Sequence, residues 1–209
     1  MVETQLEARG LHDERVLCAM REVPRDRFVP RELAAAAYED RALPIAAGQT
    51  ISQPYVVALM VEALALEGGE RVLEVGTGSG YAAAVLSRIA SEVYTIERHV
   101  ELAELASARL AALGYANCHV RIGDGTLGCP EAAPFDAILV SAGGPRVPPT
   151  LESQLAVGGR LVIPVGPARG EQRLMRITRS APDRLEREDL GEVQFVALVG
   201  AEGWAADRR

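Results

Sequence analysis

Lysine is missing from this sequence of 209 residues, and all 22 of its basic residues are arginine. This absence excludes enzymes that form lysine Schiff bases, enzymes that hold pyridoxal phosphate, and phosphate loops that use lysine. Histidine is also scarce, and the three residues His12, His99 and His119 do not have the spacing of zinc ligands. We therefore expect no metal site.

Cysteine is too rare to build a disulfide framework. Cys18, Cys118 and Cys129 are an odd number and include no Cys-x-x-Cys pair. Residues 1–14 are polar and charged, and they lack the apolar segment of a secretory signal. We predict free thiols in a reducing cytoplasm.

Long apolar runs and basic clusters are missing too. The run at residues 56–61 is far shorter than the roughly 20 residues that cross a membrane, so we expect no membrane partner. The net charge is −7 and the one basic pair is Arg208 and Arg209, which argues against binding to nucleic acid. With 48% hydrophobic and 24% charged residues, the composition is that of one globular domain spanning residues 1–209. We expect a monomer.

Strand and helix patterns alternate from Arg71 onward. Short strands are predicted at residues 71–75, 93–96, 119–122, 135–140 and 160–164, with helices at 81–90 and 98–113. The second helix should turn Leu102, Leu105, Leu110 and Leu113 inward and end at Gly114. This order predicts an α/β fold of the doubly wound, Rossmann-like class, with a mainly parallel sheet and helices on both faces.

The remaining segments flank a cofactor-binding core at residues 66–166. Residues 1–65 form a predicted helical and loop-like extension, in which Leu6, Leu11, Val16 and Met20 mark one helix face. A further helix should begin at Pro54, bury Val57, Met60, Val61 and Leu64, and stop at the glycine pair 68–69. Residues 167–209 should close the sheet with an antiparallel hairpin of strands at 174–178 and 194–199.

A glycine turn follows the first strand of the core, in the order Gly76-Thr77-Gly78-Ser79-Gly80. Glycines let the backbone approach a ligand closely, and the N–H groups of the next helix point at its anionic part. Glu97 ends the second strand about 20 positions later, where a carboxylate can accept hydrogen bonds from the two hydroxyls of a ribose. The turn therefore predicts a nucleoside-containing ligand, although a tight turn without a ligand has the same pattern.

Two details favour S-adenosylmethionine over a dinucleotide. The third glycine comes one place earlier than in the dinucleotide pattern, and Glu74 precedes the turn by two residues. A carboxylate there would repel a pyrophosphate but would suit an ammonium or sulfonium cation, and S-adenosylmethionine carries both. Asp124 and Gly125 follow the third strand, where they can bind the adenine amino group and a ring nitrogen; the alternative is a plain surface turn.

The chain resembles the protein-L-isoaspartate O-methyltransferases over roughly residues 15–204. The most specific match is Gly48-Gln49-Thr50-Ile51-Ser52-Gln53-Pro54-Tyr55, which lies outside the common cofactor core. Further matches are Val23-Pro24-Arg25, Arg27-Phe28-Val29-Pro30, Leu43-Pro44-Ile45 and Pro164-Val165-Gly166. The departures are Gln53-Pro54-Tyr55, where many relatives have Ala-Pro-His, Ala197 for a frequent proline, and Ser141-Ala142-Gly143-Gly144 for an alanine-rich run.

The resemblance implies methyl esterification of the α-carboxylate of L-isoaspartyl residues in damaged peptides and proteins. S-adenosylmethionine would become S-adenosylhomocysteine, and the ester would start repair through a succinimide. Ser52 is implied as the catalytic residue, Thr50, Ile51 and Gln53 as substrate-binding residues, and Tyr55 as a cofactor-binding residue or a lining of the substrate pocket. Glu74, the turn 76–80, Glu97, Asp124 and Gly125 would bind the cofactor.

Other interpretations remain open at this point. Ser52 could instead be the N-cap of the helix that begins at Pro54. The chain could methylate another carboxylate or a small molecule, or bind the cofactor without catalysis. A nicotinamide dehydrogenase is disfavoured by the glycine spacing and by Glu74.

Overall fold

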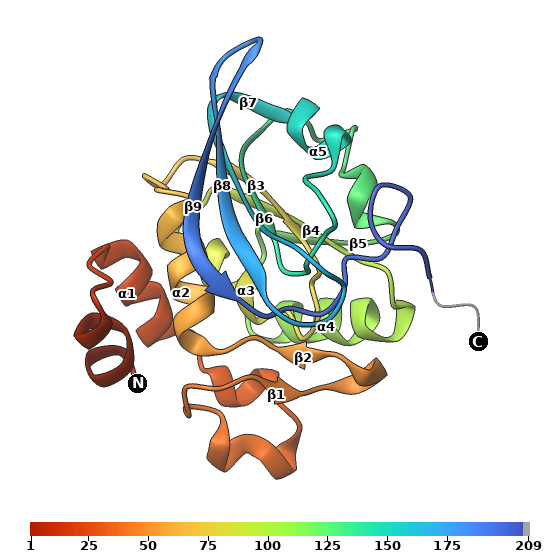
Figure 1. Ribbon diagram of the computed structural model, residues 1–209. Coiled ribbons are helices and arrows are strands. Elements are labelled where there is room, and N and C mark those ends of the chain that lie inside the picture. Colours follow the sequence, from red (N-terminus) through yellow and green to blue (C-terminus); the bar gives the residue numbers. More distant parts are fainter. Residues whose placement is uncertain (207–209) are drawn as a thin grey trace.

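Seven strands form one mixed sheet within residues 1–206, the part of the chain that the computed structural model describes (Figure 1). Their order across the sheet is β5-β4-β3-β6-β7-β8-β9. The first five in the chain run parallel, and they are β3 (Arg71–Val75), β4 (Glu92–Glu97), β5 (Cys118–Ile122), β6 (Phe135–Val140) and β7 (Leu155–Val165). β8 (Gln172–Ala181) and β9 (Arg184–Val193) extend the sheet in antiparallel fashion. Arg208 and Arg209 lie outside the described residues.

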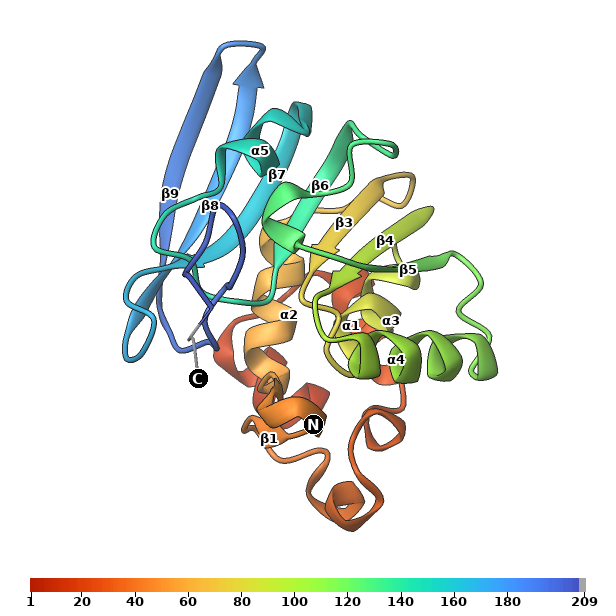
Figure 2. The same ribbon diagram turned by 90° about the vertical axis from the view of Figure 1, so that its right-hand side faces the viewer.

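Helices cover both faces of the sheet, as predicted (Figure 2). α1 (Glu14–Glu22), α2 (Pro54–Ala63), α3 (Tyr81–Ser87) and α4 (Val100–Ala112) lie on one face, and the short α5 (Pro149–Ser153) lies on the other. Side chains alternate along each strand, so Val72 packs toward the first group while Leu73 and Val75 pack toward α5. This two-sided burial explains the continuous apolar run that ends β6, a strand at the centre of the sheet.

The order of the strands reverses direction at β3, and this creates a crevice. From β3 the chain builds β4 and β5 on one side, and then crosses to β6 and β7 on the other. Val75 at the end of β3 is paired with Ile96 of β4 and with Val140 of β6. The loops that follow these strands therefore meet at one edge, which is where ligands bind in open α/β sheets.

The expected N-terminal helix is interrupted. The chain begins with a π-helical turn, Val2–Leu6, followed by a 3₁₀ turn, Glu7–Arg9. Both precede Gly10, whose φ of 93° ends the helical path. α1 begins only at Glu14, because the carboxylate of Asp13 accepts hydrogen bonds from the N–H groups of Arg15 and Val16. The predicted apolar residues are nevertheless buried: Leu6 in the first turn, Leu11 in the loop before α1, and Val16 and Met20 in α1.

The segment before α2 carries a small hairpin. β1 (Leu43–Pro44) pairs with β2 (Thr50–Ile51), and 3₁₀ turns occupy Arg25–Phe28, Arg31–Ala36 and Ala46–Gly48. α2 begins at Pro54 and buries the predicted face, but it ends at Ala63, before the glycine pair. β2 leads into α2 within two residues, and Ser52 lies in that short connection.

Two further sequence predictions are wrong. Leu105 is 47% exposed, because the buried face of α4 consists of Leu102, Ala103, Ala106 and Leu110. Residues 194–199 are not the second strand of the C-terminal hairpin, which is formed by β8 and β9 instead. That segment returns across the strand ends and bonds to Gly143, which follows β6. The N–H of Gly143 donates to the carbonyl of Val196, and the N–H of Leu198 donates to the carbonyl of Gly143. No helix of the described residues has the length and apolarity needed to cross a membrane.

Candidate active site

Three cavities adjoin at the carboxyl ends of the strands. We call them the outer cavity (about 630 Å³), the inner cavity (about 210 Å³) and the small cavity (about 40 Å³). Thr50 of β2 and Ser141, which follows β6, line all three. These two residues therefore mark the place where the spaces meet.

The inner cavity lies against the glycine turn and Glu97. Glu97 is 5% exposed, and its two carboxylate oxygens accept hydrogen bonds from the N–H groups of Gly78 (2.9 Å) and His99 (3.0 Å). Each oxygen accepts only one of these bonds, so each keeps a lone pair for a ligand. Glu97 thus fixes the glycine turn and still presents acceptors to the cavity.

Backbone geometry explains the glycines of this wall. Gly76, Gly78 and Gly80 have φ values of 95°, 54° and 90°, in the left-handed region that favours glycine. At Gly125 the reason is steric, because a Cβ atom would lie 2.3 Å from Cγ1 of Val75. Gly76, Gly78 and Gly125 all line the inner cavity.

Thr77 and Ser79 connect the glycine turn to neighbouring elements of the fold. Both are buried. The hydroxyl oxygen of Thr77 lies 2.6 Å from that of Thr95, and the carbonyl of Ser79 accepts a hydrogen bond from Arg109 (2.6 Å). These contacts tie the turn to β4 and α4, so its N–H groups are held in place for a ligand.

Glu74 lines the small cavity and is completely buried. Its Oε2 accepts a hydrogen bond of 2.5 Å from the Thr95 hydroxyl, whereas its Oε1 has no partner among the described residues. Burial raises the pKa of the Glu74 carboxyl to about 8; the Thr95 hydrogen bond opposes this rise and the negative charge of Glu97 adds to it. Within residues 1–206, Glu74 is therefore a buried acid without a cationic side chain as partner.

Asp124 does not line the inner cavity; it lines a separate cavity of about 410 Å³ that shares Arg98 and Val199 with the inner one. Its Oδ1 accepts hydrogen bonds from the N–H (2.9 Å) and hydroxyl (2.6 Å) of Thr126, and its Oδ2 accepts one from Ala201 N–H (2.6 Å). Partial burial raises the pKa of Asp124, but the bonds from Thr126 and Ala201 outweigh it and hold this pKa below its usual range. Oδ2 keeps one free lone pair.

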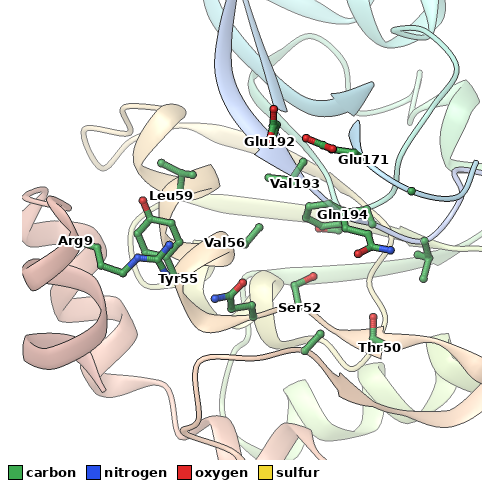
Figure 3. A pocket seen from close by; sticks show the side chains of 16 residues that line it. Arg9, Thr50, Ser52, Tyr55, Val56, Leu59, Glu171, Glu192, Val193 and Gln194 are labelled. Atoms are coloured by element: carbon green, nitrogen blue, oxygen red, sulfur yellow. The ribbon is translucent and has the colours of Figure 1, made fainter. Parts of the chain in front are cut away.

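The outer cavity is lined by Thr50, Ser52, Gln53 and Tyr55. Figure 3 shows Ser52 and Thr50 on one side of it and Glu171 and Glu192 on the opposite side. Within residues 1–206 the hydroxyl of Ser52 has no hydrogen-bond partner. The N-cap of α2 is Gln53, so the alternative interpretation of Ser52 as that N-cap is wrong. Ser52 also lines the small cavity beside Glu74.

The other residues of this segment are divided between the cavities. Ile51 is buried, pairs with Leu43 and lines the small cavity. Gln53 and Tyr55 line the outer cavity, and neither of them lines the inner or the small cavity. Tyr55, predicted to bind the cofactor or to line the substrate pocket, thus lies with Gln53 in the outer cavity.

Several lining residues escaped the sequence analysis. Ser141 was noted only as a departure from the family pattern, although its place directly after a predicted strand was a usable signal. Arg9 and Glu192 carry no such signal, because tertiary contacts alone bring them to the outer cavity. No group of three or more His, Cys, Asp or Glu side chains in the described chain is placed to hold a metal ion.

Comparison with known proteins agrees with this geometry. A family model described as Protein-L-isoaspartate(D-aspartate) O-methyltransferase (PCMT) matches residues 1–203. A protein-L-isoaspartate O-methyltransferase of Methylorubrum populi is 63% identical over 206 residues, with 97% of this chain and 96% of the relative covered.

Solved structures show the same fold over nearly the whole chain. One, a protein-L-isoaspartate O-methyltransferase, superimposes with a TM-score of 0.85 at 32% identity and covers 97% of this chain and 67% of that one. Another, from Plasmodium falciparum in complex with S-adenosyl-L-homocysteine, has a TM-score of 0.82 at 27% identity and covers 95% and 96% of the two chains.

Proposed function

Because this chain belongs to the protein-L-isoaspartate(D-aspartate) O-methyltransferase family, it is an enzyme that methylates isoaspartyl residues with S-adenosylmethionine, and we propose that its three cavities divide this work. The inner and small cavities hold the cofactor, and the outer cavity holds the isoaspartyl peptide. The observation that carries the proposal is the position of Thr50 and Ser141, which are common to all three cavities. The transferred methyl group would cross there.

The residues of the inner and small cavities fit this cofactor. The unpartnered Oε1 of buried Glu74 would accept a cationic group, and the free lone pairs of Glu97 would accept the ribose hydroxyls. The backbone of the turn 76–80 lets the ligand approach closely, and Asp124 Oδ2 with Gly125 N–H would bind adenine. When bound, S-adenosylmethionine supplies an electrophilic methyl group on a positively charged sulfur.

The same residues disfavour a dinucleotide. A pyrophosphate at this turn would face the carboxylate of Glu97, which lines the inner cavity at the end of β4. Like charges in a buried site repel strongly. A cofactor without phosphate therefore suits the inner cavity.

Catalysis on the peptide side needs orientation rather than proton transfer. A carboxylate is already ionised at pH 7 and needs no general base. The hydroxyls of Ser52 and Thr50 would donate hydrogen bonds to it and hold the attacking oxygen in line with the methyl group. Such orientation can supply about 7–11 kcal/mol of the barrier. The methyl ester then cyclises to a succinimide without the enzyme.

Arg9, the one arginine in the lining of the outer cavity, does not act as a clamp for the substrate carboxylate. Its guanidinium is paired with Asp40 at 2.8 Å and stacks on the ring of Tyr55. Hydroxyl donors can bind the carboxylate without holding it as tightly in the ground state as a charged clamp would, and this favours reaction.

One assay tests the proposal. The protein is incubated with methyl-labelled S-adenosylmethionine and two peptides that differ only in aspartate against isoaspartate. We expect base-labile methyl on the isoaspartyl peptide alone. Equal labelling of both peptides would indicate a methyltransferase for other carboxylates, and no labelling would indicate a protein that binds the cofactor without this activity.

The proposed setting is a cytoplasmic monomer. All three cysteines are free thiols. Burial raises the pKa of the Cys118 thiol to about 12 and also raises that of Cys129, so both are poorly reactive. Sedimentation of the purified protein over a range of concentrations would reveal a larger assembly.

A further inference from the structure

Asp40 binds three residues that line the outer cavity without lining the cavity itself. Its Oδ2 accepts hydrogen bonds from Arg9 Nη1 (2.8 Å) and Gln53 Nε2 (2.7 Å), and its Oδ1 accepts one from the backbone N–H of Tyr55 (3.1 Å). The donors are 31, 13 and 15 positions away in the chain. All three donor residues line the outer cavity.

The contact with Tyr55 replaces a missing helix cap. Tyr55 is the second residue of α2, so its N–H has no acceptor inside the helix. The N-cap residue Gln53 makes no side-chain cap, and Pro54 has no N–H to donate. The carboxylate of Asp40 caps this helix from another part of the chain, and its negative charge suits the helix N-terminus.

The contact with Arg9 fixes one wall of the cavity. The centre of the Arg9 guanidinium lies 3.3 Å from the centroid of the Tyr55 ring, and Figure 3 shows the two groups together. The same guanidinium forms an ion pair with Asp40 at 2.8 Å. One carboxylate therefore restrains both partners of this stack.

Ser52 depends on these restraints. Its own hydroxyl is not anchored, and its neighbours are Ile51, which pairs with Leu43, and Gln53, which Asp40 binds. We propose that Asp40 is a positioning residue for the methyl transfer, because it holds the corner 53–55 so that Ser52 faces the peptide. This inference rests on the proposed assignment of the outer cavity to the isoaspartyl peptide.

The test compares Asp40→Asn with the wild-type enzyme and with Asp183→Asn, a change at an exposed residue between β8 and β9. Asparagine keeps the shape of Asp40 but loses its charge and one acceptor. We expect kcat/KM for an isoaspartyl peptide to fall about tenfold or more, since hydrogen bonds to a charged group are lost. The Kd of S-adenosylhomocysteine should stay within about twofold, and Asp40→Glu should restore part of the activity.

A double-mutant cycle with Ser52→Ala separates positioning from general damage. If Asp40 acts through Ser52, Asp40→Asn should change kcat much less in the Ser52→Ala background than in the wild type. Three results would each overturn the proposal. The first is additive effects of the two substitutions on kcat, and the second is equal activity of Asp40→Asn and Asp183→Asn. The third is a loss of S-adenosylhomocysteine affinity in Asp40→Asn that is as large as its loss of kcat/KM.

Two controls keep the result interpretable. If Asp40→Asn does not fold, as judged by urea unfolding, Gln53→Ala removes one donor of the same carboxylate at the cavity surface and should lower kcat/KM in the same way. An unchanged kcat/KM in Gln53→Ala would then overturn the proposal. A wild-type enzyme that leaves the isoaspartyl peptide unlabelled would instead contradict the proposed function.

Discussion

Glu74 Oε2 accepts a hydrogen bond of 2.5 Å from the hydroxyl of Thr95, and that hydroxyl also lies 2.6 Å from the hydroxyl of Thr77. The chain of contacts links β3, β4 and the glycine turn. It leaves Oε1 of Glu74 buried without a hydrogen-bond partner in the described part of the chain. A buried acidic group of this kind lowers the stability of the free enzyme, and we propose that it prepares the site for a positively charged ligand.

Replacing Glu74 with Gln should change how stability depends on pH. The pKa of Glu74 is about 8 in the folded protein, against an ordinary value of 4.5. The folded state thus binds more protons between these values, and its free energy of unfolding falls as pH rises from about 4.5 to about 8. Glu74→Gln should be more stable than the wild type at pH 8, by an amount on the order of a few kcal/mol, with the difference closing at pH 5. Urea unfolding without cofactor at both pH values measures this, and a pH-independent difference would contradict it.

Cofactor binding should release a proton from Glu74. At pH 7 the carboxyl is mostly protonated, and the ammonium group of S-adenosylhomocysteine would favour its ionised form. Titration calorimetry in phosphate and in Tris, which differ in ionisation enthalpy, should report proton release for the wild type and much less for Glu74→Gln. Identical heats in both buffers for the wild type would argue against this role.

Ser52→Ala should lower turnover while cofactor affinity stays close to that of the wild type. The lost hydrogen bond to the substrate carboxylate corresponds to about 1.5–3 kcal/mol, or roughly a tenfold to hundredfold fall in kcat. Ser153→Ala, at an exposed hydroxyl on α5, is the matched control. A collapse of S-adenosylhomocysteine binding in Ser52→Ala would indicate a structural role instead.

Glu97→Ala should weaken binding of S-adenosylhomocysteine by about 1–3 kcal/mol. It removes the acceptors for the ribose and also frees the N–H groups of Gly78 and His99. Glu101→Ala, at an exposed position in the first turn of α4, should leave the affinity unchanged. Calorimetry gives both values, and equal affinities for the two variants would exclude the ribose assignment.

Gly125→Ala should destabilise the protein, whereas Gly123→Ala should not. The added Cβ at residue 125 would lie 2.3 Å from Val75 Cγ1, while at residue 123 nothing lies within 4 Å. Overpacking of this kind costs about 1–3 kcal/mol, and the shift of Val75 should also lower cofactor affinity, because Val75 lines the inner cavity. Thermal unfolding and calorimetry compare the pair, and equal stability of the two variants would be the contrary result.

Much of the core was predictable because its signals are local. The apolar runs of β3 and β6 match the predicted bounds residue for residue, and Gly76, Gly78 and Gly80 lie in a turn between β3 and α3 as predicted. The C-terminal strand was misplaced for the same reason. β9 carries many charged residues along an edge of the sheet, so it lacks an apolar pattern, whereas residues 194–199 have that pattern without forming the strand.

Local order therefore followed from the amino-acid sequence alone: which segments alternate, where the chain turns, and which short segment carries Ser52. Folding in three dimensions decided that Tyr55 faces the outer cavity, that Glu74 loses all contact with water, and that Asp40 joins Arg9 to Gln53. The physical reason is that backbone propensity and periodicity act over a few neighbouring residues. Burial and hydrogen bonding at this site depend instead on groups that only the packed sheet and helices bring together.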